Sequence, residues 1–510
     1  MNVLKPGLNC MGIYDADDTG VLVDAEDYYR AFYHTALAAR SYLLMAGWQF
    51  DSEVRLLRGK DEHDALGGGR FLRFLDQLCE RNPDLHVYIL AWDFSAVFSL
   101  EREWFQGIIF NWTTNKKIHF RFDSSHAPGA THHQKFVIAD GALAFLGGMD
   151  ICSSRWDDRH HMKENPERVD VDGHRYGSYH DIQTYHTGPV VLVLLDLFRQ
   201  RWRDSGAGEL KLPHAGALTP TVPSGAFKMP ATKVAISRTV APTPFSTPPE
   251  IQEIRRLFVD AIMSAESLIY LENQYFSSQA IFWSLVARMS MPNRPRLQII
   301  MMLPDRLPLT EELFLGLPQI RMIRSLQRVA EKTGHTLSVY SSAQADHDVR
   351  QMTFIHSKLL LIDDRFLTIG SANATNRSMG LDTELNVAWE ASLAPNEEEL
   401  VGAIRTLRSS LLAEHAGLFG CNKEHKFGNL EELTAHLESL ADDEAARLCR
   451  YQPDPTFENS ELPEALEPIA RVVDPEQPVD NEFIFESFTK SELGSFARGI
   501  FKLSQMIIRL

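Results

Sequence analysis

The sequence predicts an α/β protein made of two homologous lobes, and two repeated segments support this prediction. The segment Ala39–Phe50 (ARSYLLMAGWQF) is similar to Ala265–Phe276 (AESLIYLENQYF), at an offset of 226 residues. In both places an apolar pattern of helical spacing comes first and a short β-type stretch follows. Independently, His133–Asp140 (HQKFVIAD) recurs as His356–Asp363 (HSKLLLID), at an offset of 223 residues. Because the two offsets nearly agree, we interpret the chain as an internal duplication, and the alternation of helical and strand patterns favours layered α/β lobes.

The composition narrows the class of protein. Of the 510 residues, 44% are hydrophobic and 23% are charged, which is typical of a globular protein and excludes a disordered chain, a collagen or a disulfide scaffold. No apolar run approaches the roughly 20 residues that span a bilayer, and the five cysteines are scattered, as expected of reduced thiols. The net charge of −17 repels a polyphosphate backbone, so we expect no nucleic-acid partner. The first residues lack the features of a secretory signal peptide, and we therefore expect a protein that is cytoplasmic or exported without a cleavable signal.

Breaks in the pattern divide the chain into four parts. In order, we expect a first lobe, an inter-lobe connection, a second lobe and a C-terminal extension (12–212, 213–250, 251–420 and 421–510). Predicted strands include Leu85–Ala91 in the first lobe and Leu297–Leu303 in the second. The connection is rich in proline and small residues and is expected to run over a surface. Within the extension, 451–480 is acidic and proline-rich, and we expect a solvated, irregular arm there.

The end of the chain predicts a basic amphipathic helix. Thr489-Lys490-Ser491-Glu492 fits a capping box, and an apolar stripe follows at helical spacing: Phe496, Ile500, Leu503, Ile507 and Leu510. The segment 490–510 carries four cations against one anion, opposite in sign to the whole chain. Two placements remain open: the stripe docks on the second lobe, or it lies in a membrane interface with its cations near lipid phosphates.

The duplicated motif supplies the candidate chemistry. Alternate residues of a strand point to one face, so His133 and Lys135 are expected to project together, and His356 and Lys358 likewise. A single His-x-Lys pair is a weak signal because most such residues are solvated or structural. Duplication at matched offsets makes it a strong one. Two lysines and two imidazoles can hold and attack a phosphate without a metal, and we expect no cofactor.

Each motif is followed by a turn of small residues, Gly147–Asp150 in the first half and Gly370–Asn373 in the second. Small residues let backbone N–H groups approach an anion, and the Ser371 hydroxyl and the Asn373 amide are candidate phosphate-binding groups. Asp140 and Asp363 end the two motifs, each seven residues after the motif histidine. In a strand this odd spacing points the aspartate to the face opposite the histidine, and a turn follows, so we expect both aspartates to be structural.

Three features depart from a symmetric site. The first half has Gly148 and Asp150 where the second has Ser371 and Asn373; a carboxylate would repel a phosphate, so we expect Asp150 to be structural. His132 has the wrong parity to face the site. The run 157–161 (DDRHH) resembles metal ligands, but no second ligand set of recognised spacing accompanies it, and we interpret it as a solvated loop.

These motifs resemble the phospholipase D superfamily, and more narrowly the catalytic unit of the eukaryotic-type phospholipases D in a minimal, bacterial-like form. The resemblance covers roughly 12–420. Besides the two His-x-Lys-x4-Asp motifs and the Gly-Ser-x-Asn continuation, it rests on several segments: Thr131–Asp140 (THHQKFVIAD), Gly147–Asp157 (GGMDICSSRWD), His180-Asp181-Ile182 leading to Gly188-Pro189 and Arg201-Trp202, and Leu271–Phe276 (LENQYF).

The resemblance implies two lobes around a pseudo-twofold axis that share one active site. In this family one imidazole attacks phosphorus to form a phosphohistidine, and the other protonates the leaving alcohol and then activates its replacement. By resemblance, His133 is the nucleophile and His356 the acid/base. Glu384 would orient His133, and Asp181 would orient His356. Lys135, Lys358 and Asn373 would hold the phosphoryl oxygens.

The leading hypothesis is a phospholipase D that hydrolyses the distal phosphodiester of phosphatidylcholine or phosphatidylethanolamine to phosphatidic acid and an alcohol, with transphosphatidylation as a competing outcome. We expect a monomer that meets its phospholipid peripherally at a membrane surface. One alternative is a cardiolipin-synthase-type phosphatidyltransferase, but the sequence predicts no membrane-inserting N-terminal helices. A second is a metal-independent nuclease, which the net charge disfavours. A third is a phospholipid-binding pseudoenzyme. A pseudoenzyme would have lost a His or Lys, and both motifs are intact.

Overall fold

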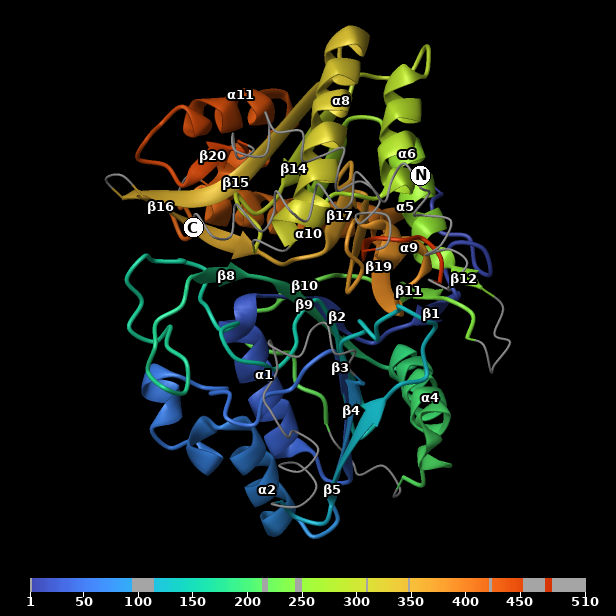
Figure 1. The fold of residues 1–510 in the computed structure, drawn as a ribbon, viewed down its shortest axis with the longest axis vertical. Coiled ribbons are helices and arrows are strands. Elements are labelled where there is room, and N and C mark those ends of the chain that lie inside the picture. Colours follow the sequence, from blue (N-terminus) through green and yellow to red (C-terminus); the bar gives the residue numbers. More distant parts are fainter. Residues whose placement is uncertain are drawn as a thin grey trace, which may run out of the picture.

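The computed structural model describes residues 2–93, 114–212, 219–243, 250–308, 311–346, 349–421, 424–452 and 473–478. These residues form two β-sheets with helices packed against them, one sheet in each half of the molecule (Figure 1). The predicted α/β class with two lobes is confirmed.

The first sheet runs in the order β10-β2-β9-β7-β6-β3-β4-β5. Its strands are β2 (Thr19–Val23), β3 (Tyr42–Gly47), β4 (His86–Trp92), β5 (Ile118–Asp123), β6 (Phe136–Ala139), β7 (Leu143–Gly147), β9 (Ile182–Thr187) and β10 (Phe227–Lys228). Its helices are α1 (Asp24–Ala38), α2 (Phe71–Arg81) and α4 (Val190–Trp202). As the sequence predicted, an amphipathic helix, α1, leads into a buried strand, β3.

The second sheet runs in the order β1-β11-β19-β18-β17-β13-β14-β15-β16-β8, with β12 beside β11 and β20 beside β15. Its strands are β1 (Gly12–Asp15), β8 (Ser178–His180), β11 (Lys233–Val240), β12 (Ile251–Gln252), β13 (Leu268–Glu272), β14 (Gln298–Met302), β15 (Thr336–Asp346), β16 (Val349–Ile355), β17 (Leu359–Ile362), β18 (Phe366–Gly370), β19 (Glu384–Glu390) and β20 (Leu448–Arg450). Its helices are α5 (Glu253–Ser264), α6 (Gln279–Ser290), α8 (Leu317–Thr333), α9 (Asn376–Gly380), α10 (Glu397–His415) and α11 (Leu430–Ala441).

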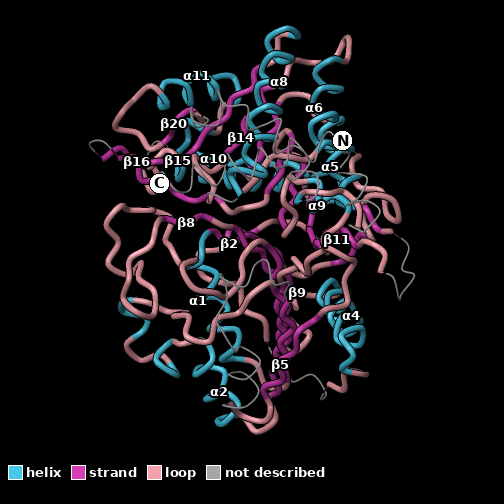
Figure 2. The backbone as a smooth tube through the Cα atoms, viewed as in Figure 1, coloured by secondary structure: helices cyan, strands magenta, loops and turns pink. Residues whose placement is uncertain are grey.

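The outer faces of the two sheets carry separate helical layers. One face of the first sheet buries the apolar sides of α1 and α2, and one face of the second buries α5, α6 and α8. Figure 2 shows these helices on the outside of the strands. Each half therefore has a core of its own.

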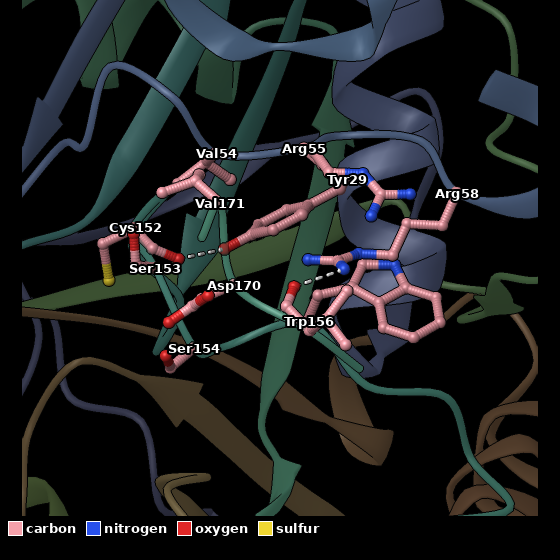
Figure 3. Close-up of a pocket in the computed structure, with 11 residues that line it drawn as sticks. Tyr29, Val54, Arg55, Arg58, Cys152, Ser153, Ser154, Trp156, Asp170 and Val171 are labelled. Atoms are coloured by element: carbon pink, nitrogen blue, oxygen red, sulfur yellow. Dashed lines mark hydrogen bonds between the residues drawn. The ribbon is translucent and has the colours of Figure 1, made fainter. Parts of the chain in front are cut away.

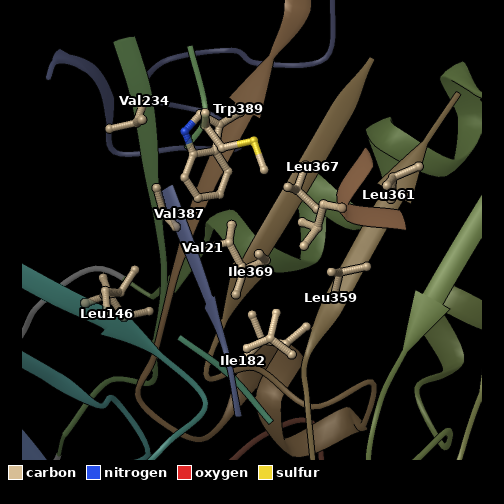
Figure 4. Close-up of a cluster of buried hydrophobic side chains, with 14 of the residues drawn as sticks. Val21, Leu146, Ile182, Val234, Leu359, Leu361, Leu367, Ile369, Val387 and Trp389 are labelled. Carbon is tan, nitrogen blue, oxygen red and sulfur yellow. The ribbon is translucent and has the colours of Figure 1, made fainter. Parts of the chain in front are cut away.

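A third core joins the halves where the two sheets face each other. Val21, Leu146 and Ile182 of the first sheet belong to one buried cluster with Leu359, Ile369 and Trp389 of the second (Figure 4). Helices α4, α10 and α11 also contribute side chains to this cluster. Because apolar burial stabilises by about 25 cal/mol per Å², this shared core holds the lobes in a fixed relation, which a site built from both lobes requires.

Some strands from the first half of the chain belong to the sheet of the second half, which the sequence did not predict. Strand β1 begins the expected first lobe yet pairs with β11 in the second sheet, and β8, also from the first half of the chain, pairs with β16. The connection 213–250 is a correction to our expectation: it contains β11, a largely buried strand between β1 and β19, instead of running over a surface throughout. The apolar run Val234–Ile236 lies between proline-rich segments, and their composition dominated the prediction.

The C-terminal extension also contributes to the second half. Helix α11 packs into the shared core, and β20 adds an antiparallel strand to β15. In the stretch expected to be a solvated arm, Asp474 is buried and accepts hydrogen bonds from Ser277 and Arg377, so this part of the arm is attached to the second lobe. The predicted amphipathic helix over 490–510 lies outside the described residues. In the described part of the chain, no helix combines the length and the apolar character needed to cross a bilayer.

Candidate active site

The two motif histidines are each bound by a carboxylate of the other half of the chain. His133 Nδ1 lies 3.1 Å from both oxygens of Glu384, which begins β19 in the second half. His356 Nδ1 lies 2.6 Å from Oδ2 of Asp181, which lies between β8 and β9 in the first half. The structure therefore brings both predicted pairs together. Because Nδ1 donates to a carboxylate, the Nε2 atom of each neutral imidazole is the one left to accept a proton or attack.

The backbone repeats this exchange between the halves. The N–H of His133 donates to the carbonyl of Thr383 (3.0 Å), and the N–H of His356 donates to the carbonyl of His180 (2.8 Å). The motif residues precede β6 and β17 in extended segments, whereas the sequence predicted them inside the strands. The reason is that β6 begins to pair with β3 only at Phe136, and β17 begins to pair with β13 only at Leu359.

The two lysines are buried, and their surroundings differ. Lys135 Nζ lies 3.2 Å from Asp150 Oδ2, and it also donates to the His133 carbonyl. Lys358 Nζ donates to the His356 carbonyl and lies 3.5 Å from Gln274 Oε1, with no carboxylate as an ion-pair partner among the described residues. Asp150 also accepts from the Trp48 N–H (2.9 Å). Among the described residues, Lys358 is thus the lysine without a carboxylate at ion-pair distance, and an anionic ligand would supply that partner.

Ser371 corrects one expectation. Its hydroxyl is fully buried and donates to Glu384 Oε2 at 2.5 Å, so it orients the carboxylate instead of facing a phosphate. Ser378, which the sequence analysis missed, donates to the other Glu384 oxygen at 2.7 Å. The backbone N–H of Asn373 donates to the Ser378 hydroxyl (3.1 Å), and its side-chain Oδ1 is buried without a hydrogen-bond partner among the described residues.

The aspartates that end the motifs have equivalent structural contacts. Asp140 accepts from the N–H groups of Arg40, Ser41 and Tyr42, and Asp363 accepts from those of Glu266, Ser267 and Leu268. Each aspartate thereby joins the end of its motif strand to the start of β3 or β13. Both have positive φ, a conformation that aspartate tolerates better than most residues.

This geometry agrees with comparisons to known proteins. The sequence matches the family described as "Phospholipase D" over residues 35–307, just over half of the chain. The chain belongs to the phospholipase D family. A second description, "Cardiolipin synthase, PLD-like domain", matches residues 258–401. The resemblance inferred from the motifs is therefore confirmed.

Relatives of this phospholipase D family member include plant proteins named phospholipase D alpha. Phospholipase D alpha 2 of Oryza sativa subsp. japonica is 24% identical, with 75% of this chain and 63% of the relative covered. Phospholipase D alpha 3 of Arabidopsis thaliana is 23% identical, with 74% and 61% covered. The chain thus spans less than two thirds of the length of these relatives. Among solved structures, phosphatidylserine synthase of Haemophilus influenzae has a TM-score of 0.50 at 14% identity, covering 77% of this chain and 87% of that one.

Charge and burial set the protonation of this phospholipase D site. Burial, together with Lys135 and Lys358, lowers the pKa of His133 well below its usual value, and burial with Lys358 and Arg155 does the same for His356. Burial raises the pKa of Asp181 to about 6 and that of Glu384 to about 7. Near neutral pH both imidazoles are therefore uncharged.

Burial also lowers the pKa of Lys358 to about 7, with Lys135 acting in the same direction against the opposing effect of Asp181. Arg155 is a further cation near His356 that the sequence analysis did not single out, although it lies in the quoted segment 147–157; its guanidinium carbon lies 4.7 Å from the Tyr179 ring centroid. An anionic phosphate is the ligand that such a concentration of partly desolvated cations favours.

His132 faces away from this site. Its Nδ1 lies 2.8 Å from the Thr383 hydroxyl, and its Nε2 lies 3.3 Å from Asp123, as its parity indicated.

The run 157–161 corrects a second expectation, because it is not a solvated loop. Asp157, Arg159 and His161 are buried. Their partners lie outside the run: Arg159 donates to Glu414, 255 residues further along the chain, at 2.6 Å, and Asp157 accepts from Arg168, 11 residues further along, at 3.0 Å. A local pattern cannot reveal partners that lie more than 200 residues away.

A small pocket in the first lobe is lined by Tyr29, Arg58, Cys152, Trp156 and other residues (Figure 3). Its polar groups largely bind one another: the Tyr29 hydroxyl donates to the Cys152 carbonyl at 3.4 Å, and Arg58 donates to the Val169 carbonyl at 2.8 Å. Neither motif histidine lines it, so we do not assign it to the candidate site.

Gly148 provides the first test of the site. A Cβ atom at this position would overlap Asp181 Oδ1, which explains why the first half has glycine where the second has Ser371. We predict that Gly148→Ala displaces Asp181 from His356 and lowers kcat about 10- to 100-fold, because a displacement of about 1 Å in a catalytic group costs rate on this scale. Gly402→Ala in α10, where a Cβ meets open space, is the matched control. Unchanged kcat in a folded Gly148→Ala protein would contradict the role of Asp181.

The pKa shifts predict a narrow pH optimum near 7 for kcat/KM. Activity falls toward acid as Asp181 and Glu384 bind protons, and it falls toward alkali as Lys358 loses its proton. A bound phosphodiester anion favours the charged ammonium, so the alkaline limb of kcat should lie at higher pH than that of kcat/KM. Lys358→Arg should move the alkaline limb upward at reduced rate, since a guanidinium keeps its proton. Coincident alkaline limbs for kcat and kcat/KM would contradict this assignment.

Proposed function

We propose that this protein transfers the phosphatidyl group of a glycerophospholipid to water or to an alcohol through a phosphohistidine, that is, that it acts as a phospholipase D with transphosphatidylation activity. Phosphatidylcholine and phosphatidylethanolamine are the proposed substrates, and phosphatidic acid is the product of hydrolysis. The observation that carries the proposal is the pair of carboxylate–imidazole contacts exchanged between the halves, beside two buried lysines.

In the first step, His133 Nε2 attacks phosphorus and forms an N–P bond, while the bond to the head-group oxygen breaks. The leaving oxygen takes its proton from His356 Nε2. His356 must be protonated for this, although its surroundings lower its pKa; the negative charge of the bound phosphodiester offsets the neighbouring cations and favours the imidazolium.

In the second step, His356, now neutral, removes the proton from water or an alcohol, whose oxygen attacks phosphorus and releases His133. Glu384 keeps the attacking tautomer of His133 in place throughout, with Ser371 and Ser378 fixing both of its oxygens. Lys135, Lys358 and Asn373 are proposed to bind the non-bridging oxygens, where charge accumulates in the transition state.

The two imidazoles are more accessible than the lysine of the first motif. The side chains of His133 and His356 are 16% and 12% exposed, whereas that of Lys135 is 3% exposed, so the imidazole edges form the accessible floor of the site. The Tyr179 ring lies 5.4 Å from that of His356 and supplies apolar surface beside it. We propose peripheral contact of a monomer with a membrane surface.

A phosphatidyltransferase is the second candidate, because a cardiolipin-synthase description matches 258–401 and a phosphatidylserine synthase shares the fold. The two candidates have the first step in common and differ in the acceptor of the second. A phosphatidyltransferase requires a specific alcohol, such as a lipid glycerol hydroxyl, whereas a phospholipase D accepts water.

Product analysis tests both candidates. Mixed phospholipid vesicles are incubated with the protein in water alone, with ethanol, or with phosphatidylglycerol, and the lipids are identified by mass spectrometry. We expect phosphatidic acid in water and phosphatidylethanol with ethanol, and a loss of at least about 10³-fold in His133→Ala and His356→Ala. His63→Ala, whose side chain is 87% exposed, is the control. Products formed only with phosphatidylglycerol would favour the transferase, and activity in both histidine variants would contradict the proposed mechanism.

A further inference from the structure

A second cluster of chemically active side chains lies buried between the lobes. Asp24 at the start of α1, His161 after β7, His180 in β8 and Glu414 in α10 each point one ligand atom toward a common centre, and these atoms all lie within 4.8 Å of one another. All four side chains are almost completely buried. We propose that this cluster binds one divalent transition-metal ion, with Zn²⁺ favoured, as a structural site that links the two lobes.

The hydrogen bonds of both imidazoles prepare them as ligands. His161 Nδ1 lies 2.9 Å from Asp157, and His180 Nε2 lies 3.1 Å from Glu272. When these nitrogens donate their protons to carboxylates, His161 Nε2 and His180 Nδ1 present their lone pairs to the centre of the cluster. A carboxylate that accepts from the outer nitrogen is the usual arrangement of a metal-bound histidine.

Among the described residues, the inward atoms of the four side chains share one hydrogen bond, between His161 Nε2 and Glu414 Oε1 at 3.1 Å. Asp24 Oδ2 and His180 Nδ1 are buried, and neither has a hydrogen-bond partner among the described residues. Yet His180 Nδ1 lies 2.6 Å from Glu414 Oε1 and 3.0 Å from Asp24 Oδ1, while His161 Nε2 lies 3.1 Å from Glu414 Oε1. Ligand atoms on a tetrahedral zinc ion lie about 3.3 Å apart, so a modest outward movement accommodates the ion.

The outer contacts hold the ligands in place. Glu414 Oε2 accepts from Arg159 at 2.6 Å, which leaves Oε1 for the centre. Asp157 accepts from Arg168, and Glu272 accepts from Ser357 at 2.6 Å. The backbone of Asp24 has φ of 64°, a strained conformation for a residue other than glycine, and such strain often marks functional positions.

The charge of the cluster matches a divalent ion. Four buried carboxylates, those of Asp24, Asp157, Glu272 and Glu414, face two guanidinium groups, those of Arg159 and Arg168. Protons on the two imidazoles balance the remaining two charges when no metal is bound, and one divalent cation would take the place of those two protons. Two imidazole nitrogens and two carboxylate oxygens are borderline ligands that suit Zn²⁺ in four-coordination.

The site would stabilise the lobe interface without taking part in phosphoryl transfer. Three ligands come from the first half of the chain and Glu414 comes from the second, and β8 lies at the boundary between the lobes (Figure 1). His180 directly precedes Asp181, so the ion would also steady the carboxylate that binds His356. The proposal does not depend on the proposed function, because binding can be measured without substrate.

Metal content of the full-length protein tests the proposal. The protein is unfolded in chelator, refolded with or without Zn²⁺, dialysed and analysed by mass spectrometry for metal. We expect about one Zn²⁺ per chain, a melting temperature several degrees above that of the metal-free protein, and, with Co²⁺, visible absorption bands of a tetrahedral site. Retention of less than about 0.1 ion per chain, with equal melting temperatures, would overturn the proposal.

Two variants locate the site. His161→Gln should weaken Zn²⁺ binding at least about 100-fold. His186→Gln replaces a buried histidine whose ring nitrogens bind the hydroxyls of Thr19 and Thr184 and whose ring stacks on Trp389, and it should bind Zn²⁺ like the parent. If His161→Gln does not fold, the Co²⁺ spectrum of the unaltered chain still decides: bands without the intensity of nitrogen- and oxygen-bound tetrahedral Co²⁺ would overturn the proposal. Full metal binding by a folded His161→Gln protein would also overturn it.

Discussion

The hydrogen bond between an imidazole of one lobe and a carboxylate of the other determines how the rest of the structure must be built. Glu384 reaches His133 from the second half, and Asp181 reaches His356 from the first. Each motif histidine therefore depends on the other lobe for the carboxylate that binds its Nδ1 atom. The lobes must therefore be fixed to within a few tenths of an ångström, and the shared core between the sheets, with the exchanged strands β1 and β8, provides this rigidity.

The duplicated site is not symmetric, and the differences follow from packing. Asp181 occupies the space that a side chain at position 148 would need, whereas the corresponding space near Glu384 admits the Ser371 hydroxyl. Lys135 shares its charge with Asp150, and Lys358 does not have such a partner among the described residues. These contacts give the two halves different electrostatic environments, as a mechanism with one nucleophile and one acid/base requires.

The sequence predicted what depends on local pattern and on repetition. The α/β class, the helix–strand units that precede β3 and β13, and the residues of the two His-x-Lys motifs all follow from spacing, and the structure places the motif residues together. Contacts between distant segments could not be predicted in this way. The hydrogen bond from the Ser371 hydroxyl to Glu384 depends on how β18 and β19 pair, which the local pattern does not show, and the hydroxyl was therefore assigned to a phosphate. The burial of His161 depends on Glu414, which lies 253 residues further along the chain.

The stereochemistry at phosphorus tests the central claim most directly. The substrate is a phospholipid whose phosphorus is chiral because it carries one sulfur atom and one isotopically labelled oxygen. The protein transfers its phosphatidyl group to an alcohol, and the configuration at phosphorus in the product is determined by ³¹P NMR. If His133 and His356 act in two successive in-line displacements, each step inverts the configuration and the product retains that of the substrate. Inversion would mean that the acceptor attacks phosphorus directly, and it would contradict a phosphohistidine held between the two lobes.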